Sequence, residues 1–362
     1  MLIVFIDALP ASKNFQIRDF KKSKLVPNLG YSVNLHNEIF NGKSPDQMGF
    51  FGEYLYNPNP SIIKKTFFSF LNILEYAPFK LSSLFKIFLR RFFNIRFGQI
   101  PFKLVPFFNR DGKYPFIGEC DSILNKFQCF ITDDLKNGLG NRDIVAIDNI
   151  NSHLKNNSPN KNLFLSLCDL DGIGHKYGTN SNEYKNRLNF LEKHINKLTN
   201  DYSKQFPDES IIVLSDHGMS NVNGFIDARK VISEIKNEYN VKFFYDSLYM
   251  HVFVDNSTSK NNQLIEINKK LSSNLPLHCF SIEERIKYGV TNKKFGDLLF
   301  VINDKLAFSP NLFGFLKMKA YHGYLPLSED NKGIFLHKNL KIDISNNEVS
   351  SLNANQIIND SL

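Results

Sequence analysis

The chain has 362 residues, which is long enough for one large α/β domain with insertions or for two ordinary domains. Its formal net charge of +8 favours anionic partners in general, such as phosphate esters, nucleic acid or a lipid surface. The four cysteines have no CxxC spacing, which argues against a zinc knuckle or a dense disulfide framework. They predict buried free thiols in a reducing compartment.

The N-terminal sequence passes from Met1 directly into a short apolar run, without a basic leader or a small-residue cleavage site. We therefore expect that no signal peptide is removed. Every stretch of about 18 residues carries charge, so a membrane-spanning helix is not expected. The sequence favours a cytoplasmic protein, either free or associated with a membrane surface.

The first core unit begins with an apolar, β-branched run from Leu2 to Ile6, which predicts a strand. A loop follows, and Val33 to Phe40 has the pattern of a helix that Asn41–Gly42 ends. Ser32 is therefore expected at a helix N-terminus. Residues 43–49 are turn-forming and close this unit.

A segment with a different composition follows, in which phenylalanines alternate with basic residues. The phenylalanines are Phe67, Phe68, Phe70, Phe79, Phe85, Phe88, Phe92, Phe93, Phe97, Phe102, Phe107 and Phe108, and the basic residues are Lys64, Lys65, Lys80, Lys86, Arg90, Arg91, Arg96 and Lys103. Glu75 is the only acidic residue among them. Leu84, Phe88, Phe92 and Ile95 follow helical spacing, with Lys86 and Arg90 off that stripe. We assign residues 53–140 to a helical, Phe-rich basic cap inserted into the core.

Two interpretations of this cap stay open. In the first, which we favour, the Phe side chains pack on the core while Lys and Arg stay solvated. In the second, residues 61–108 contact a membrane surface peripherally. Such a cap could also hold a lipid-linked or nucleotide substrate, with Phe faces against apolar or base groups and cations near phosphates.

The core resumes with alternating helices and strands. Helices are expected over 143–156, 181–205 and 227–239, and strands over 162–167 and 210–214. This alternation predicts an α/β fold with a mainly parallel sheet between helix layers. Residues 241–255 have the pattern of a hairpin and 298–302 that of a strand, so 220–320 is expected to form a smaller α/β elaboration. A short helix is expected at 354–358. We assign 1–362 to one catalytic domain.

Three aspartates and three histidines suggest a metal centre. Asp7, Asp171 and Asp216 end or closely follow predicted strands, where active sites form in open α/β sheets. His175, His217 and His322 complete the set. Aspartate and neutral histidine suit zinc, manganese or iron, and no cysteine lies in the clusters.

Local geometry refines this expectation. Asp216 and His217 are adjacent at a strand end, so their side chains should diverge and serve two ions or brace one from two directions. Gly172 and Gly174 would let a loop bend so that Asp171 and His175 reach one ion. Asp169 is interpreted as a loop-stabilising carboxylate.

A two-metal centre clamps the attacking and leaving oxygens of a phosphoryl transfer, and it needs a nucleophile. Ser32 is the best candidate, because amide groups at the N-terminus of a helix can bind a phosphoryl oxygen. A serine that only caps the N-terminus of the helix would give the same sequence pattern, so this role of Ser32 stays open. His36, one turn further along, is interpreted as structural.

The order of these residues resembles that of the alkaline phosphatase superfamily, and within it the nucleotide pyrophosphatase/phosphodiesterase branch. The resemblance covers residues 2–7, 26–49, 163–179, 210–219 and 320–336. Asp171-Gly-Ile-Gly-His175-Lys-Tyr-Gly178 is similar to the branch's D-x-x-G-H-x-x-G. Ser215-Asp-His-Gly-Met219 is similar to S-D-H-G-M, and His322-Gly-Tyr324 to H-G-Y.

The resemblance implies two divalent ions, and we expect zinc, with manganese or iron as alternatives. Asp171, His175 and His322 would hold one ion, while Asp7, Ser32, Asp216 and His217 would hold the other. The implied activity is hydrolysis of a phosphodiester or pyrophosphate bond through a phosphoserine-type intermediate. The substrate would be a small-molecule or lipid-linked phosphate ester, and specific nucleic-acid binding is not expected. No separate cofactor-binding residues are assigned.

The sequence departs from the branch at three places. Ser32 replaces a threonine, Leu35 stands where the branch has an asparagine that contacts the phosphate, and Met48 replaces a histidine before Gly49. Two alternatives therefore stay open. One is a phosphomonoesterase or phosphoryl transferase of the same superfamily, and the other is a catalytically degenerate relative that binds a membrane or nucleic acid.

Overall fold

A computed structural model describes most of the chain. The described residues are 1–52, 55–75, 81–93, 99–109, 122–131, 139–156, 159–255, 259–312, 316–342, 344 and 348–362. They belong to two compact units: unit 1 is Met1–Ser44, Tyr114–Val222 and Met318–Leu362, and unit 2 is Pro45–Lys113 and Asn223–Lys317. The insertion boundaries expected from the sequence, 53–140 and 220–320, stay predictions.

Unit 1 is built on a seven-stranded sheet with the order β17-β2-β16-β7-β1-β6-β5. The strands are β1 (Leu2–Ile6), β2 (Lys21–Val26), β5 (Gln128–Ile131), β6 (Leu163–Leu167), β7 (Ile211–Leu214), β16 (Gly333–Lys338) and β17 (Glu348–Ser350). Strands β5, β6, β1 and β7 run parallel, whereas β16 is antiparallel to both of its neighbours. The sheet is therefore mainly parallel, as predicted.

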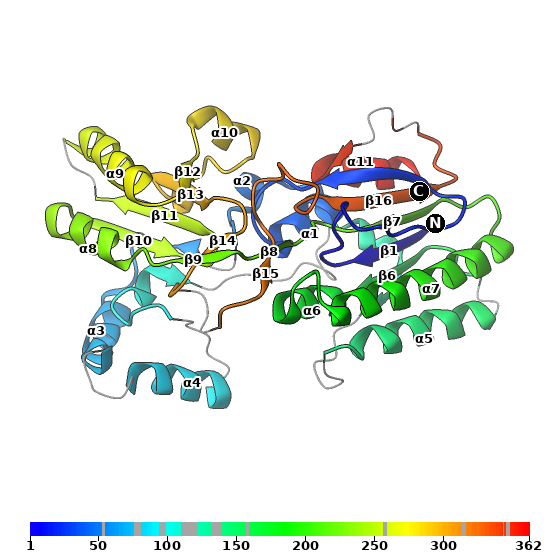
Figure 1. The fold of residues 1–362 in the computed structure, drawn as a ribbon, viewed down its shortest axis with the longest axis horizontal. Helices are drawn as coiled ribbons and strands as arrows, with labels where there is room; N and C mark the ends of the chain where they lie inside the picture. Colours follow the sequence, from blue (N-terminus) through cyan, green and yellow to red (C-terminus); the bar gives the residue numbers. More distant parts are fainter. Residues whose placement is uncertain are drawn as a thin grey trace. The chain divides into compact units, whose positions relative to one another are not determined.

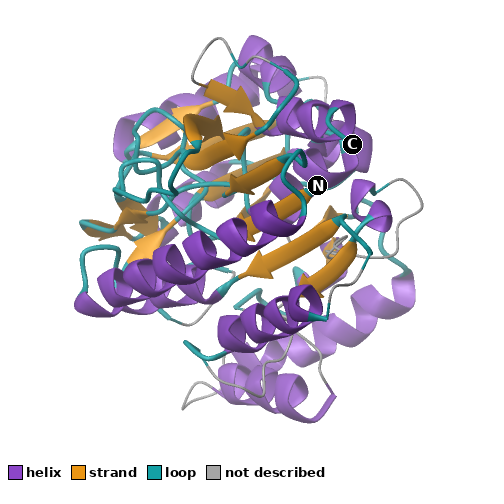
Figure 2. Ribbon diagram, turned by 90° about the vertical axis from the view of Figure 1, so that its right-hand side faces the viewer, coloured by secondary structure: helices purple, strands orange, loops and turns teal. Residues whose placement is uncertain are grey.

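Helices cover both faces of this sheet (Figures 1 and 2). Helices α5 (Arg142–Lys155), α6 (Asp169–Tyr177) and α7 (Asn182–Gln205) pack with Leu2, Val4 and Ile6 of β1. Helices α1 (Ser32–Asn41) and α11 (Ser351–Asp360) pack with Ile3 and Phe5, which point to the other face. This arrangement confirms the predicted α/β fold and the helices expected near 33–40, 143–156, 181–205 and 354–358.

Strands β2 and β16 were not expected from the sequence pattern. Three of the six residues of β2 are lysines, Lys21, Lys22 and Lys24, and the strand alternates only weakly between exposed and buried residues. Strand β16 lies between β2 and β7 and is buried on both faces over most of its length, so its residues do not alternate.

Helix α1 is held in place by α11, largely through a buried carboxyl group. Glu38 has no exposed surface and accepts hydrogen bonds from Asn28 Nδ2 at 3.1 Å and from the Ser351 hydroxyl. Asn355 Nδ2 donates to Ile39 O at 2.9 Å. These contacts orient the helix that begins at Ser32.

Unit 2 contains the predicted hairpin, formed by β10 (Val241–Tyr245) and β11 (Tyr249–Val254), in an antiparallel sheet of order β10-β11-β13-β12. Strands β12 (Leu277–Cys279) and β13 (Leu298–Ile302) complete that sheet. The helices are α2 (Pro45–Met48), α3 (Ile62–Leu71), α4 (Leu81–Phe93), α8 (Arg229–Glu238), α9 (Lys260–Asn274) and α10 (Ile282–Lys287). Shorter strands pair as β3 (Leu55–Tyr56) with β4 (Phe108–Asn109) and as β9 (Gly224–Ile226) with β14 (Leu306–Phe308).

The favoured interpretation of the cap agrees with the buried Phe102 and Phe108 and with the exposed Lys64 and Lys65, but it is wrong for the predicted stripe of helix α4. Leu84 and Phe88 are 56% and 44% exposed, whereas Lys86 is buried. Lys86 Nζ lies 2.7 Å from Glu75 Oε1 and 4.7 Å from the centre of the Phe102 ring, which together replace its hydration. The other predicted stripe members, Ile95 and the side chain of Phe92, lie outside the described part, as do Phe79, Lys80, Arg96 and Phe97.

Cys129, Cys168 and Cys279 are free thiols, as expected, but they are half-buried and not fully buried. Cys120 lies outside the described residues. Among the helices that the structure describes, none is both long and apolar enough to span a membrane.

Glu38 should give the protein a measurable pH dependence of stability. Burial raises the pKa of Glu38 from its ordinary 4.5 to about 7, against the opposing effect of its hydrogen bonds. The folded state therefore binds the proton more tightly than the unfolded chain does. The associated stabilisation is complete below pH 4.5 and is lost as the pH rises through about 7.

We expect Glu38→Gln to remove up to about 3 kcal/mol of this pH-dependent change in unfolding free energy, measured by urea denaturation across that range. Glu183→Gln, an exposed carboxyl at the start of α7, is the matched control and should leave the slope unchanged. Equal slopes in Glu38→Gln and the wild type would contradict the assignment.

Candidate functional site

The candidate site lies where three neighbouring parallel strands of unit 1 end. In the sheet, β1 lies between β7 and β6, with Phe5 opposite Leu214 and Ile6 opposite Leu167. Asp7 directly follows β1, and Asp216 is the second residue after β7. The carboxyl ends of parallel strands meet at one edge, so these acids are brought together by the strand register.

Asp171 and His175 do not lie on a bent loop, as we expected, but on helix α6. Residues four apart in a helix lie on one face, which brings Asp171 and His175 together without a loop. The glycines instead permit close packing, because a Cβ at Gly174 would overlap Met219 Sδ. The helix therefore brings Asp171 and His175 together, as the bent loop was expected to do.

A carboxylate from α5 anchors the start of α6. Asp143 Oδ1 accepts hydrogen bonds from the amides of Cys168 and Asp169, at 2.9 and 3.2 Å. Asp169 is fully buried and in turn pairs with Arg142 Nε at 2.7 Å. Asp169 thus has a structural partner, and Asp171 is the acid of this helix that faces the site.

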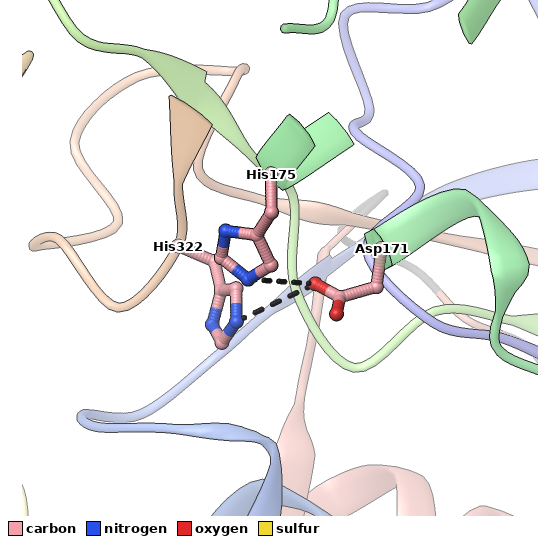
Figure 3. Close-up of side chains that lie close together, drawn as sticks. All are labelled: Asp171, His175 and His322. Atoms are coloured by element: carbon pink, nitrogen blue, oxygen red, sulfur yellow. Dashed lines mark ion pairs between the residues drawn. The ribbon is translucent and has the colours of Figure 1, made fainter. Parts of the chain in front are cut away.

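Asp171, His175 and His322 form the first group of candidate ligands (Figure 3). His175 Nε2 lies 3.2 Å from Asp171 Oδ1, and His322 Nε2 lies 3.5 Å from the same oxygen. His322 directly follows β15 (Ala320–Tyr321), which pairs with β8 (Ser220–Asn221). The segment that carries His322 is also tied to α6, because the amide of Lys319 donates to His175 O at 2.8 Å.

Asp7, Asp216 and His217 form the second group, which is buried throughout. His217 Nε2 lies 3.2 Å from Asp216 Oδ2 and 3.6 Å from Asp7 Oδ1. The neighbouring Asp216 and His217 therefore converge on one group and do not diverge to two, because the chain after β7 is no longer extended strand. Ser32 joins this group, with its Oγ 3.0 Å from His217 Nε2.

Two backbone carbonyls determine which ring nitrogen faces the site. His175 Nδ1 lies 2.8 Å from Ala320 O, and His217 Nδ1 lies 2.9 Å from Gly218 O. A carbonyl can only accept, so each Nδ1 must carry a proton and donate it. In the neutral ring, Nε2 then presents a lone pair to the site, the form in which histidine binds metal.

Burial disfavours the charged form of the carboxylates in the site, and neighbouring like charges add to this effect at Asp7. Burial, with the charges of Asp216 and Asp171, raises the pKa of Asp7 well above its ordinary value. Burial raises the pKa of Asp171 too, but the imidazoles, His175 foremost, outweigh that effect and lower it. Burial, reinforced by His217, lowers the pKa of His322 well below its ordinary range, which keeps this imidazole neutral.

The donor set fits two cations. Asp7 Oδ1, Asp171 Oδ1 and Asp216 Oδ2 are buried, and among the described residues no hydroxyl or backbone amide donates a hydrogen bond to them. Their near neighbours are imidazole nitrogens, at 3.0 to 3.6 Å. In each group the oxygen and nitrogen donors lie within 4.8 Å of one another. Oxygen and imidazole donors without thiolates suit a divalent ion that keeps positions open for substrate. That these residues bind metal stays a prediction.

His36 is a site residue that the sequence interpretation left aside. It is buried one turn after Ser32, and its Nε2 lies 3.0 Å from Asp216 Oδ2. Its ring also packs edge-on against Phe5. Its position one helical turn after Ser32, on the same face of α1, is the signal that could have identified it.

Gly218, the residue after His217, lets the backbone approach the segment that contains Asp330 and Lys332 closely. A Cβ at this position would overlap the backbone oxygens of Asp330 and Lys332, lying 2.6 Å from the latter. Backbone atoms cannot rotate away, so we expect Gly218→Ala to reduce the free energy of unfolding by about 3 kcal/mol. Gly49→Ala is the control: its φ is positive but its Cβ meets open space, so it should cost about 1 kcal/mol. Equal unfolding midpoints for the two variants would contradict this packing.

Comparisons with solved structures agree with this fold. The murine ectonucleotide pyrophosphatase/phosphodiesterase 5 matches with a TM-score of 0.61 and 13% identity, over 99% of this chain and 93% of that chain. An inactive variant of the murine protein in complex with AMP matches with a TM-score of 0.61 and 13% identity, over 100% and 94%. The human protein matches with a TM-score of 0.60 and 13% identity, over 99% and 93%. At this identity the likeness shows the fold.

No curated protein matches this chain in sequence. The sequence model of the type I phosphodiesterase/nucleotide pyrophosphatase family, however, matches residues 103–311, more than half of the chain. The matched region contains Asp171, His175, Asp216 and His217. The chain therefore belongs to the type I phosphodiesterase/nucleotide pyrophosphatase family and is a phosphodiesterase-like hydrolase.

Proposed function

We propose that the protein hydrolyses a phosphodiester or pyrophosphate bond with Ser32 as the nucleophile, at a centre that holds two divalent ions. The observation that carries this proposal is the position of the Ser32 hydroxyl. Its oxygen lies 3.0 Å from His217 Nε2, and Ser32 is the first residue of helix α1. A hydroxyl beside a metal-ligand group and at a helix N-terminus is placed to attack a bound phosphoryl group.

Each group of donors would hold one ion. Asp171, His175 and His322 would bind the first, and Asp7, Asp216 and His217, with Ser32, the second. We propose zinc, which these donors favour, with manganese or iron as the alternatives. When bound, the ions would act as Lewis acids on the phosphoryl oxygens and lower the pKa of the attacking hydroxyl.

The reaction would proceed in two displacements. Ser32 Oγ bonds to phosphorus, the bond to the leaving oxygen breaks, the serine proton passes to solvent and the leaving oxygen takes a proton from solvent. The oxygen of a water molecule then bonds to phosphorus and the bond between phosphorus and Ser32 Oγ breaks. One water proton passes to Ser32 Oγ and the other to solvent, and a phosphate monoester is released. The AMP complex of the murine relative makes nucleotide diesters the first substrates to assay.

His36 would act as a positioning residue. It contacts the Asp216 oxygen that also faces His217, so it orients this carboxylate without touching the substrate. Its burial between Asp216 and Phe5 keeps the ring in place. In metal sites generally, groups that hydrogen-bond to a metal ligand fix its orientation in this way.

A second candidate function rests on Leu35. Its side chain is buried and offers no hydrogen-bond donor at the position where the related enzymes have a phosphate-contacting asparagine. This difference favours a phosphomonoesterase or phosphoryl transferase of the same fold. Comparing turnover of an aryl phosphodiester with that of the matching monoester separates the two functions.

We expect Ser32→Ala to reduce hydrolysis of an aryl phosphodiester by at least roughly a thousandfold, because no other group would form the covalent bond. The rate is measured together with the metal content, so that loss of ions is distinguished from loss of the nucleophile. Ser152→Ala, an exposed serine on α5, is the matched control and should keep full activity. Wild-type turnover by metal-loaded Ser32→Ala would exclude the covalent mechanism.

Metal content tests the two donor groups independently of activity. Asp171→Asn and Asp216→Asn should each retain about one divalent ion fewer than wild type after reconstitution and dialysis, because each removes an anionic ligand from a different group. Elemental analysis of the purified variants gives the count. Asp148→Asn, an exposed carboxylate on α5, should bind as many ions as wild type. An unchanged count in both site variants would contradict the assignment.

A further inference from the structure

Helix α3 of unit 2 has an apolar face that is exposed in the described part of the chain. Ile62, Ile63, Phe67 and Phe70 are 80%, 82%, 56% and 71% exposed. None of the ten residues of this helix is buried. Soluble proteins seldom expose large apolar side chains together, and such a surface usually marks an interaction site.

The exposed residues lie on one side of α3 and lysines flank them. At 100° per residue, Ile62, Ile63, Phe67 and Phe70 fall within an arc of about 140°. Lys64 and Lys65 lie about 60° beyond its two edges. Both lysines are exposed. An apolar face bordered by lysines is the pattern of a helix that lies in a bilayer interface.

Helix α4 repeats this arrangement in the same unit. Leu84, Ile87 and Phe88 are 56%, 50% and 44% exposed, and they lie within an arc of about 100°. The buried side of α4 carries Lys86, which lies about 160° from Leu84 and Phe88 and about 100° from Ile87. Three apolar side chains of this helix therefore face outward while a charged one faces inward.

Helices α3 and α4 both contact other residues of unit 2, although several of their apolar side chains are exposed. Phe68 of α3 and Phe85 of α4 both pack against the buried Phe102, at centroid distances of 6.4 and 6.1 Å. Glu75, which follows α3, binds both Lys86 Nζ at 2.7 Å and the amide of Phe102 at 3.1 Å. Contacts of Phe68, Phe85 and Lys86 inside the unit hold the two helices, while several of their other apolar side chains remain exposed.

We propose that α3 and α4 form a docking surface for an anionic lipid bilayer. Residues 61–108 contain eight lysines and arginines and one acid, a formal charge of +7, which complements an anionic surface. The same charge would oppose pairing of this surface with a second copy of itself. With ten and thirteen residues, the helices are too short to span a bilayer, so they would lie along its surface.

The proposal is tested by co-sedimentation of the full chain with vesicles of phosphatidylcholine alone and of phosphatidylcholine containing phosphatidylglycerol. We expect binding to the anionic vesicles that weakens with salt. The double variant Phe67→Ser/Phe70→Ser should bind them at least roughly tenfold more weakly, because two aromatic side chains no longer insert. The double variant Lys64→Gln/Lys65→Gln should bind roughly 30-fold more weakly at low salt.

The chain supplies a matched control on another helix of unit 2. Ile282 and Ile286 of α10 are 74% and 65% exposed, but Glu283 and Glu284 balance Arg285 and Lys287 there. Ile282→Ser/Ile286→Ser should therefore bind anionic vesicles as wild type does. Unfolding midpoints of all the variants confirm that binding is compared between folded proteins.

Three outcomes would overturn the proposal. The first is wild-type vesicle binding by Phe67→Ser/Phe70→Ser, and the second is equal loss of binding in the α10 control. The third is a wild-type dimer in solution, measured by light scattering, that dissociates in Phe67→Ser/Phe70→Ser, since a second copy would then occupy this surface. None of these measurements depends on the catalytic proposal.

Discussion

The candidate site depends on one electrostatic constraint, the concentration of buried carboxylates at the end of three parallel strands. The pairing of β7, β1 and β6 brings Asp7 and Asp216 together, and α6 adds Asp171. Burial disfavours all three charges, but the neighbouring imidazoles outweigh this effect at Asp171 and Asp216 and lower the pKa of both. At Asp7, burial and the charges of its two acidic neighbours prevail and raise the pKa.

Helix α1 connects that constraint to the rest of unit 1. Ser32 lies at its first position, His36 contacts Asp216 one turn later, and Glu38 joins the helix to α11. A single ten-residue helix thus contributes a candidate nucleophile, a positioning residue and a buried anchor. Its other buried polar residues are also paired: Asn34 donates to Leu29 O before the helix, and Asn37 donates to Val33 O within it.

Much of this site was predictable from the sequence, because the strands that carry it are short, apolar and followed directly by the acids. The order of Asp7, Asp171 and Asp216 along the chain was sufficient to expect their convergence at one sheet edge. Helix α6 was not predictable, because Gly172 and Gly174 have low helix propensity. Their close packing, Gly174 against Met219 and Gly172 against Leu139, depends on the tertiary structure. The exposure of Leu84 and the burial of Lys86 could not be predicted either. Hydrophobic periodicity shows that two faces of a helix differ, but it does not show which face packs against the protein.

The position of β16 in the sheet has a consequence for folding during synthesis. This strand, residues 333–338, lies between β2 and β7, so it joins a strand near the N-terminus to the strand before Asp216. Until β16 leaves the ribosome, β7 and β2 each present an unpaired edge, which is a template for aggregation. The donors Asp7, Asp216 and His217 have all been synthesised long before that point, whereas His322 emerges only shortly before β16, the strand that joins β2 to β7. The two ligand groups should therefore become available in sequence, with the group that contains Ser32 first.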